Sequence, residues 1–300
     1  MQGAGACLHG ERPTNRKDQP APPYAGRRLA LLTRHYKERA IAPVLEPALG
    51  CRIEVVSGYD TDRLGTFTRD IPRAGTQIEA ARKKARIGME FSGHPLGLAS
   101  EGSFGPDPIA GWLPWNIEFL IFLDDERELE IVGAAQGAAD PVYVLADDWP
   151  VAESFARQTA FPAQHLVVRP DSENDPRIRK GIATWKQLKT AFAWAQDQSA
   201  SGLVFIHTDL RAHANPARMN RIRLAAEDLL GRLVSCCPAC GMPGFARVER
   251  IPGLPCGDCG APTRETCAEV YGCLKCPYRQ TRPHTGPGYA DASRCDVCNP

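Results

Sequence analysis

Four Cys-x-x-Cys pairs near the end of the sequence are the residues whose spacing most clearly specifies a chemistry. Fifteen residues separate the first two pairs, and eighteen separate the last two. Both separations fit a zinc ribbon, in which two knuckles supply four thiolates at the corners of a tetrahedron. We therefore expect two structural Zn²⁺ sites without an open catalytic position, built from Cys237, Cys240, Cys256, Cys259, Cys273, Cys276, Cys295 and Cys298.

The pairing of these knuckles is left open by their spacing. Thirteen residues lie between the second and third pairs, so a crossed arrangement is also compatible with the sequence. Cys236 is an alternative ligand to Cys237, and Cys267 is expected to be a spare thiol. Ten of the twelve cysteines fall in the last 65 residues and no export signal precedes them, so metal binding is favoured over disulfides.

Four polar segments follow predicted strands, where α/β sheets usually place their sites. Hydrolysis of a nucleoside triphosphate requires carboxylates for Mg²⁺ and cations for the phosphates. Glu79 and Glu101 are the candidate carboxylates, and Lys37 and Lys84 are the candidate cations. The segments are TRHYKE (33–38), GTQIEAARKKA (75–85), ASEGSFG (99–105) and HTDLRAHANPARM (207–219).

Local structural roles are an alternative for several of these residues. Thr76 and Glu79 have the spacing of a capping box, in which Glu79 only satisfies a helix N-terminus. Arg211 and His213 can be surface residues before an N-cap at Asn215.

Alternating strand and helix patterns predict the elements that must position these residues. Apolar runs predict strands, and the last two of them, separated by a charged turn, predict a hairpin. We expect a three-layer α/β/α domain with a mixed sheet over residues 27–233. A disordered leader over 1–26 and a double zinc-ribbon domain over 234–300 complete the expected organisation. The main runs are 28–33, 51–57, 94–100, 117–124 and 129–136 for strands, with helices over 37–50, 75–90 and 215–233.

Composition and charge narrow the function classes. The formal net charge is +1, which gives no general argument for nucleic acid. Residues 236–300 contain seven Lys and Arg and six Asp and Glu, so this part has no excess of positive charge that would indicate nucleic acid binding. A protein or RNA partner for it stays open. Neither a membrane span nor a secretory signal is predicted, and a cytoplasmic location is expected.

The order of the polar segments resembles the inosine/xanthosine triphosphate pyrophosphatase superfamily over residues 28–140. That family opens with T-x-N-x-x-K, continues with a helix beginning G-T-F-x-E-N-A-x-x-K-A, and then has a strand ending in an acidic pair. Thr33 matches the first pattern, and Lys37 lies one residue before the lysine position of that pattern. Residues matching the other two patterns are Gly75, Thr76, Glu79, Ala81, Lys84 and Ala85, then Ala99 and Glu101. The resemblance implies a three-layer fold, with Glu101 at the metal-binding acid.

The family reaction is Mg²⁺-dependent cleavage of a nucleoside triphosphate to the monophosphate and pyrophosphate. By the same resemblance Thr33, His35 and Lys37 belong to the substrate site. Arg211, His213 and Arg218 take the place of a late base-reading segment. The sequence departs from the pattern at His35 and Ala80, which replace asparagines, and at Ser100, which replaces the first acid.

Two functions follow from these observations. One is a Mg²⁺-dependent nucleotide pyrophosphatase-like hydrolase. The other is a catalytically inactive nucleotide- or RNA-binding adaptor that uses the same site, with the zinc module as its docking surface. The whole chain also resembles an uncharacterised bacterial family with this layout of an α/β part followed by cysteine pairs.

Overall fold

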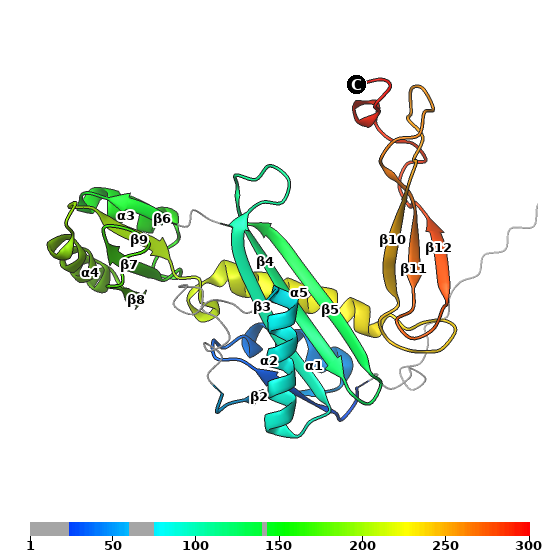
Figure 1. Cartoon of the computed structure of the whole chain (residues 1–300), viewed down its shortest axis with the longest axis horizontal. Helices are drawn as coiled ribbons and strands as arrows, with labels where there is room; N and C mark the ends of the chain where they lie inside the picture. Colours follow the sequence, from blue (N-terminus) through cyan, green and yellow to red (C-terminus); the bar gives the residue numbers. More distant parts are fainter. Residues whose placement is uncertain (1–23, 60–74, 140–142) are drawn as a thin grey trace, which may run out of the picture.

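The computed structural model describes residues 24–59, 75–139 and 143–300, and these form three β-sheets with five α-helices in the described part (Figure 1). Most of the expected leader, residues 1–23, lies outside the described residues. No helix in the described ranges combines the length and the apolar character that crossing a membrane requires.

The first sheet is mixed, as the sequence predicts. Its strand order is β2-β1-β3-β4-β5, where β1 runs parallel to β2 and β3, and β3, β4 and β5 form an antiparallel meander. Buried apolar runs produce these strands because each side of the sheet is covered. The strands are β1 (Arg28–Leu32), β2 (Arg52–Val56), β3 (Leu96–Pro106), β4 (Pro114–Asp124) and β5 (Leu129–Ala138).

Helices cover both faces of this sheet, and strand alternation decides which residues each helix contacts. On one face, Ala85 and Met89 of α2 (Gln77–Ser92) pack with Ala99 and Ile121. The other face carries α1 (Glu38–Leu49) and α5 (Pro216–Val234), which pack with the even-numbered Leu98, Leu120 and Phe122. Residues of β3 and β4 that are odd in number therefore face α2, and even-numbered residues face α1 and α5.

A second sheet lies within the region that the sequence analysis assigned to one sheet. Its strand order is β6-β9-β7-β8, every neighbouring pair is antiparallel, and it has its own buried core with α3 and α4. Periodicity shows where strands occur but not which strands pair, so the separation could not be derived from the sequence. The elements are β6 (Tyr143–Ala146), α3 (Trp149–Gln158), β7 (Leu166–Pro170), β8 (Arg179–Ile182), α4 (Trp185–Gln198) and β9 (Val204–Thr208).

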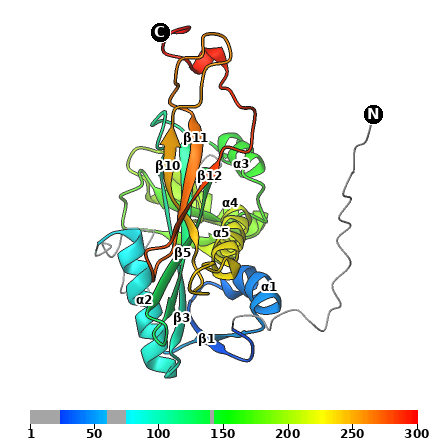
Figure 2. The ribbon, with the colours of Figure 1, turned by 90° about the vertical axis from the view of Figure 1, so that its right-hand side faces the viewer.

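The cysteine-rich part is a three-stranded antiparallel sheet that projects beyond the end of α5 (Figure 2). Its strands are β10 (Ala246–Pro252), β11 (Thr266–Gly272) and β12 (Arg279–Pro283). Two contacts attach its base to the β4–β5 hairpin. The Lys275 ammonium lies 3.1 Å from the Glu128 carboxylate, and Gly244 packs against the side chain of Ile131.

Close packing of α5 on β5 depends on a glycine. A Cβ atom at Gly133 would lie 2.5 Å from the Cβ of Leu229 and would also overlap the carbonyl of Ala225. Both obstacles belong to the body of α5 rather than to a flexible side-chain end. The helix must therefore move outward if Gly133 carries any side chain.

We expect Gly133→Ala to lower the free energy of unfolding by about 1–3 kcal/mol, because overpacking displaces α5. Gly105→Ala in β3 is the matched control, since nothing lies within 4 Å of its Cβ position. Urea denaturation of both variants checks this. Equal stability of the two variants would contradict the packing argument.

Candidate functional site

Lys37 lies just after the carboxyl end of β1, at the start of α1, and its side chain turns into the protein. Its ammonium donates a 2.8 Å hydrogen bond to the Ser100 carbonyl and lies 3.5 Å from the Ser100 hydroxyl. The side chain is buried. Burial, followed by the positive charge of Arg218, lowers the pKa of Lys37 to about 7, against the opposing effects of Glu118 and Glu101. Near neutral pH this amine can therefore gain a proton when an anion approaches.

A second buried lysine forms an ion pair on the α2 face of the sheet. Lys84 of α2 lies 2.6 Å from Glu101 of β3, and their side chains are only 11% and 5% exposed. This proximity joins two of the segments that the sequence analysis selected. A carboxylate and an ammonium are thereby fixed beside the strand that also bonds Lys37.

The α5 face carries a further buried ion pair. The Arg218 Nε lies 2.7 Å from an oxygen of Glu118, and both side chains are almost fully buried. Asn116 donates to the same carboxylate oxygen at 3.2 Å. Gly102 lies opposite Glu118 in the ladder, where any Cβ would collide with the Glu118 carboxylate. Glycine at this position is what leaves room for the carboxylate.

Glu118 was missed by the sequence analysis. Apart from Asp124 at the end of the strand, it is the only charged residue of β4. It follows Asn116 by two residues and therefore lies on the same face of the strand. Those two polar residues in a buried strand were the available signal. Its second oxygen has no hydrogen-bond partner among the described residues.

The loop residues expected to bind substrate gather beside Lys37. The rings of His35 and His213 have centroids 5.1 Å apart. Burial, followed by the charge of His213, lowers the pKa of His35 to about 3, so its imidazole is neutral at physiological pH. The guanidinium of Arg211 lies 2.5 Å from the carboxylate of Asp209. Burial raises the pKa of Asp209, but the hydrogen bonds and charge of Arg211 lower it more, so the pKa lies below its usual value.

Glu79 takes the local role that its spacing allows. Its carboxylate accepts hydrogen bonds from the Thr76 amide at 2.7 Å and the Thr76 hydroxyl at 3.0 Å, and Thr76 caps α2 in return. These bonds lower the pKa of Glu79. The side chain of Glu79 is exposed. Its carboxylate bonds Thr76 in the capping box and takes no part in the Lys84–Glu101 ion pair.

Most of the sequence candidates lie near one another, as the contacts above and the charges that act on Lys37 and His35 indicate. They are Lys37, His35, Lys84, Glu101, Arg211, His213 and Arg218. Thr33 is part of the loop after β1, and its buried hydroxyl has no hydrogen-bond partner in the described ranges. Arg218 also lines a small pocket together with Phe104, Asn116 and Gln164.

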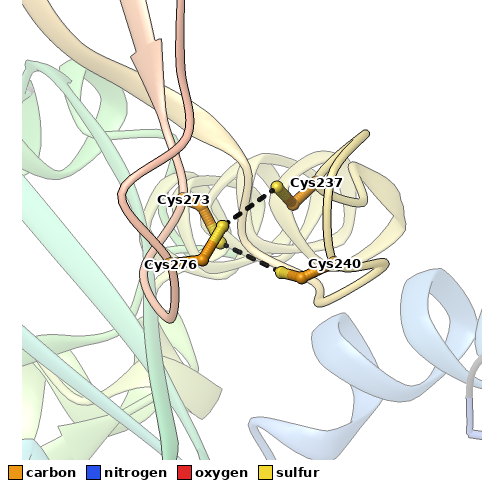
Figure 3. Close-up of side chains that lie close together, drawn as sticks. All are labelled: Cys237, Cys240, Cys273 and Cys276. Carbon is orange, nitrogen blue, oxygen red and sulfur yellow. Dashed lines mark hydrogen bonds between the residues drawn. The ribbon is translucent and has the colours of Figure 1, made fainter.

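The eight paired cysteines form two groups, each with four sulfurs within 4.8 Å of one another. The pairing is crossed. The first group combines the first and third knuckles, Cys237, Cys240, Cys273 and Cys276 (Figure 3). The second group combines the second and fourth knuckles, Cys256, Cys259, Cys295 and Cys298. The groups occupy opposite ends of the β10–β12 sheet.

Sulfur separations in both groups fit a tetrahedral metal. Contacts of 3.7 and 3.6 Å occur in the first group, and 3.9 and 3.6 Å in the second. Four sulfurs at about 2.3 Å from Zn²⁺ would be separated by about 3.8 Å. The two Cys₄ groups are thus compatible with two zinc sites.

Backbone geometry around the knuckles supports thiolate ligands. Gly241 and Gly260 follow the first two knuckles with φ of 71° and 72°, which glycine adopts without strain. Amides of Cys298 and Val297 lower the pKa of Cys295 to about 7. Cys236 is exposed and belongs to neither group, and Cys267 donates to the Pro252 carbonyl at 3.3 Å, so neither is a ligand in this arrangement.

Residues 84–300 match a family described as a domain of unknown function, DUF6671. The chain belongs to this family. No curated protein matches the chain. The DUF6671 match begins at Lys84 in α2 and includes Glu101, Glu118, Arg218 and all eight paired cysteines, whereas Lys37 precedes it.

Burial of Lys37 makes stability depend on pH in a defined direction. Because its folded pKa lies below its unfolded value, the unfolded chain binds more protons between about pH 7 and 10. The contribution of Lys37 is therefore most unfavourable below pH 7, and stability rises as the pH increases through that window.

We expect Lys37→Met to be as stable as the wild type or more stable by about 1–4 kcal/mol at pH 6, because it removes a buried charge. The variant should also lose the rise in stability between pH 7 and 9.5. Urea unfolding at several pH values measures both effects. Lys83→Met, which changes an exposed lysine of α2, is the control, and an unchanged pH slope in the Lys37 variant would overturn the assignment.

Proposed function

We propose that this chain is a Mg²⁺-dependent hydrolase of a nucleoside triphosphate or a related phosphorylated nucleotide. The observation that carries the proposal is that Lys37 and the Lys84–Glu101 ion pair lie close together, just beyond the carboxyl end of β1. Lys37 bonds the carbonyl of Ser100, the residue before Glu101 in β3, and both charges of the ion pair influence its pKa. Cations and a carboxylate at this edge of an α/β sheet suit a polyphosphate ligand. Resemblance to the pyrophosphatase superfamily supports the same substrate class.

The residues present are compatible with a Mg²⁺ ion held jointly by protein and substrate. Mg²⁺ is commonly bound through one or two carboxylates, with waters and phosphate oxygens completing its coordination. Glu101 would be the protein ligand, and the ion would supply charge neutralisation on the phosphates. Glu118 lies on the other face of the sheet and is already paired with Arg218, so it is not assigned to the ion.

The lysines would bind and orient the phosphates. Lys84 would exchange part of its contact with Glu101 for a phosphate oxygen, and Lys37 would carry its full charge once an anion offsets its burial. The neutral imidazole of His35 and the side chains of Arg211 and His213 would border the ligand. These groups would hold the substrate in one orientation and displace water from it.

In the proposed reaction a water oxygen forms a bond to the α-phosphorus as the bond from that phosphorus to the bridging oxygen breaks. The bridging oxygen leaves with pyrophosphate, and the nucleoside monophosphate remains. The proton released by the water passes to the carboxylate of Glu101.

A second candidate is a nucleotide-binding protein without turnover. Two observations favour it: Glu79 is occupied in a capping box, and a serine, Ser100, precedes Glu101. The α2 face thus offers one carboxylate at this site. In this role the ribbon would be the docking surface for a protein or RNA partner.

Pyrophosphate release from a panel of nucleoside triphosphates with Mg²⁺ tests the hydrolase. We expect Glu101→Gln to reduce turnover by about 100-fold or more, because it removes the metal ligand and proton acceptor. Glu90→Gln, an exposed change on α2, should leave turnover unaltered. Circular dichroism of each variant verifies folding.

Comparable turnover in Glu101→Gln and wild type would refute the assigned role. Nucleotide binding by calorimetry that Lys37→Met weakens, without product from any nucleotide, would select the second candidate. Absence of both binding and turnover would exclude the two functions together.

We also propose that both Cys₄ groups hold structural Zn²⁺. Closed four-sulfur coordination stabilises a small domain that lacks a large core. The distribution of buried apolar residues agrees, since the principal core clusters belong to the two α/β sheets rather than to the β10–β12 sheet.

Metal analysis of the purified chain should give two zinc ions per molecule. Cys240→Ser and Cys259→Ser each alter one group, so each variant should retain about one ion. Cys267→Ser, outside both groups, should retain two. Two ions retained in either ligand variant, or iron in place of zinc, would contradict the proposal.

A further inference from the structure

A basic groove lies on the second sheet, and Gly181 in its lining is next to the guanidinium of Arg211. It occupies about 450 Å³ between the edge strand β8 and helix α4. Its lining consists of Arg179, Lys180, Gly181, Ile182, Lys186, Gln187, Thr190 and Ala191. Three of these residues are cations and none is a carboxylate, so the groove has a net positive lining. Its volume lies within the range of small-molecule sites.

Arg179 is held in position for an anion. It lies opposite Val168 in the β7–β8 ladder, and its guanidinium lies 4.2 Å from the centre of the Trp194 ring of α4. Stacking fixes the guanidinium plane while leaving its N–H groups available at the edge. No carboxylate is paired with Arg179 in the described part of the chain.

The neighbouring acids are bound elsewhere. Asp171 accepts bonds from Ser199 and Ser201, and Asp175 pairs with Arg177 at 2.5 Å. Lys186 has no ion-pair partner of its own within the described ranges. These two acids are therefore not paired with Arg179 or Lys186.

Polar and apolar groups are separated within the groove. The side-chain oxygen of Gln187 accepts a 3.0 Å hydrogen bond from the Ala183 amide, which leaves the NH₂ group of Gln187 available as a donor. Ile182 and Ala191 are buried apolar residues of the lining. Donors and cations beside an apolar surface match a ligand that has one anionic end and one apolar body.

We propose that this groove binds a phosphorylated small molecule, with its phosphate between Arg179 and Lys186 and its apolar portion against Ile182 and Ala191. Phosphate is favoured over a monoanion because a guanidinium, an ammonium and an amide can each bond one of its oxygens. Among the described residues, the groove lining contains no aromatic ring, which disfavours a single-stranded nucleic acid stacking its bases there.

Phenyl phosphate is a suitable probe, because it combines a phosphate with an apolar ring. Titration into the full-length, zinc-loaded chain should change the fluorescence of Trp194, since the ligand contacts the guanidinium stacked on that ring. Trp194→Phe should remove the signal while calorimetry still detects binding. Inorganic phosphate should bind more weakly, and benzyl alcohol should not bind.

Variants separate this groove from general surface charge and from the Lys37 site. Arg179→Gln and Lys186→Gln should each weaken phenyl phosphate by about tenfold, because each removes a charged hydrogen bond. Lys189→Gln is the matched control: Lys189 is also on α4, but its ammonium lies 5.3 Å from the centre of the Trp149 ring and outside the groove. Its affinity should stay within twofold. Lys37→Met should keep the fluorescence response of Trp194, which reports binding in the groove and not at the Lys37 site.

Equal weakening by Lys189→Gln would reduce the effect to surface charge and overturn the proposal. So would loss of all binding in Lys37→Met, absence of binding in the wild type, or preference for an oligonucleotide or an acidic peptide over phenyl phosphate. Arg179→Lys is included in case Arg179→Gln is unstable, and it should weaken binding while it retains the charge. Lys186 is exposed, so its substitution gives a test independent of folding.

Discussion

Alternation of side chains along the β3–β4 ladder is the constraint on which the candidate site depends. The two strands pair from Leu96 with Asp124 to Pro106 with Pro114 without a shift in register. Glu101 is consequently directed toward α2, and Glu118 toward α5. A slip by one residue would exchange the faces and bury both carboxylates against apolar helices.

This separation explains why each buried carboxylate has its own cation. Glu101 is compensated by Lys84, and Glu118 by Arg218. Lys37 approaches from the end of β1 and senses both acids and both cations, while its direct bonds are to Ser100. Because no carboxylate bonds Lys37 directly, an anionic ligand can change its proton affinity more easily than that of Lys84, which is paired with Glu101.

Local features of the fold were predictable because they depend on short-range physics. The helices expected over 75–90 and 215–233 are α2 and α5, and Asn215 caps α5 as predicted. The capping box of Glu79 was visible as an alternative in the sequence, and the structure decides in its favour. Whether the carboxylate has any role in turnover stays a prediction.

Long-range features were not predictable in the same way. The second sheet depends on which strands pair, and the partnership of Glu118 with Arg218 spans 100 residues. Neither leaves a periodic pattern, because hydrophobic spacing records burial rather than the identity of the partner. The cysteine spacing likewise permitted both consecutive and crossed pairs, and only the β10–β12 ladder distinguishes them.

The crossed cysteine groups would have a consequence for metal binding by the β10–β12 part of the chain. Cys237 and Cys276 are 39 positions apart, Cys256 and Cys298 are 42 apart, and each of these loops contains one knuckle of the other group. Closing either loop restricts the ends of the other and lowers the entropy that its closure costs. Two groups with no ligand in common would therefore be thermodynamically linked, so that a metal ion bound at one group favours binding at the other.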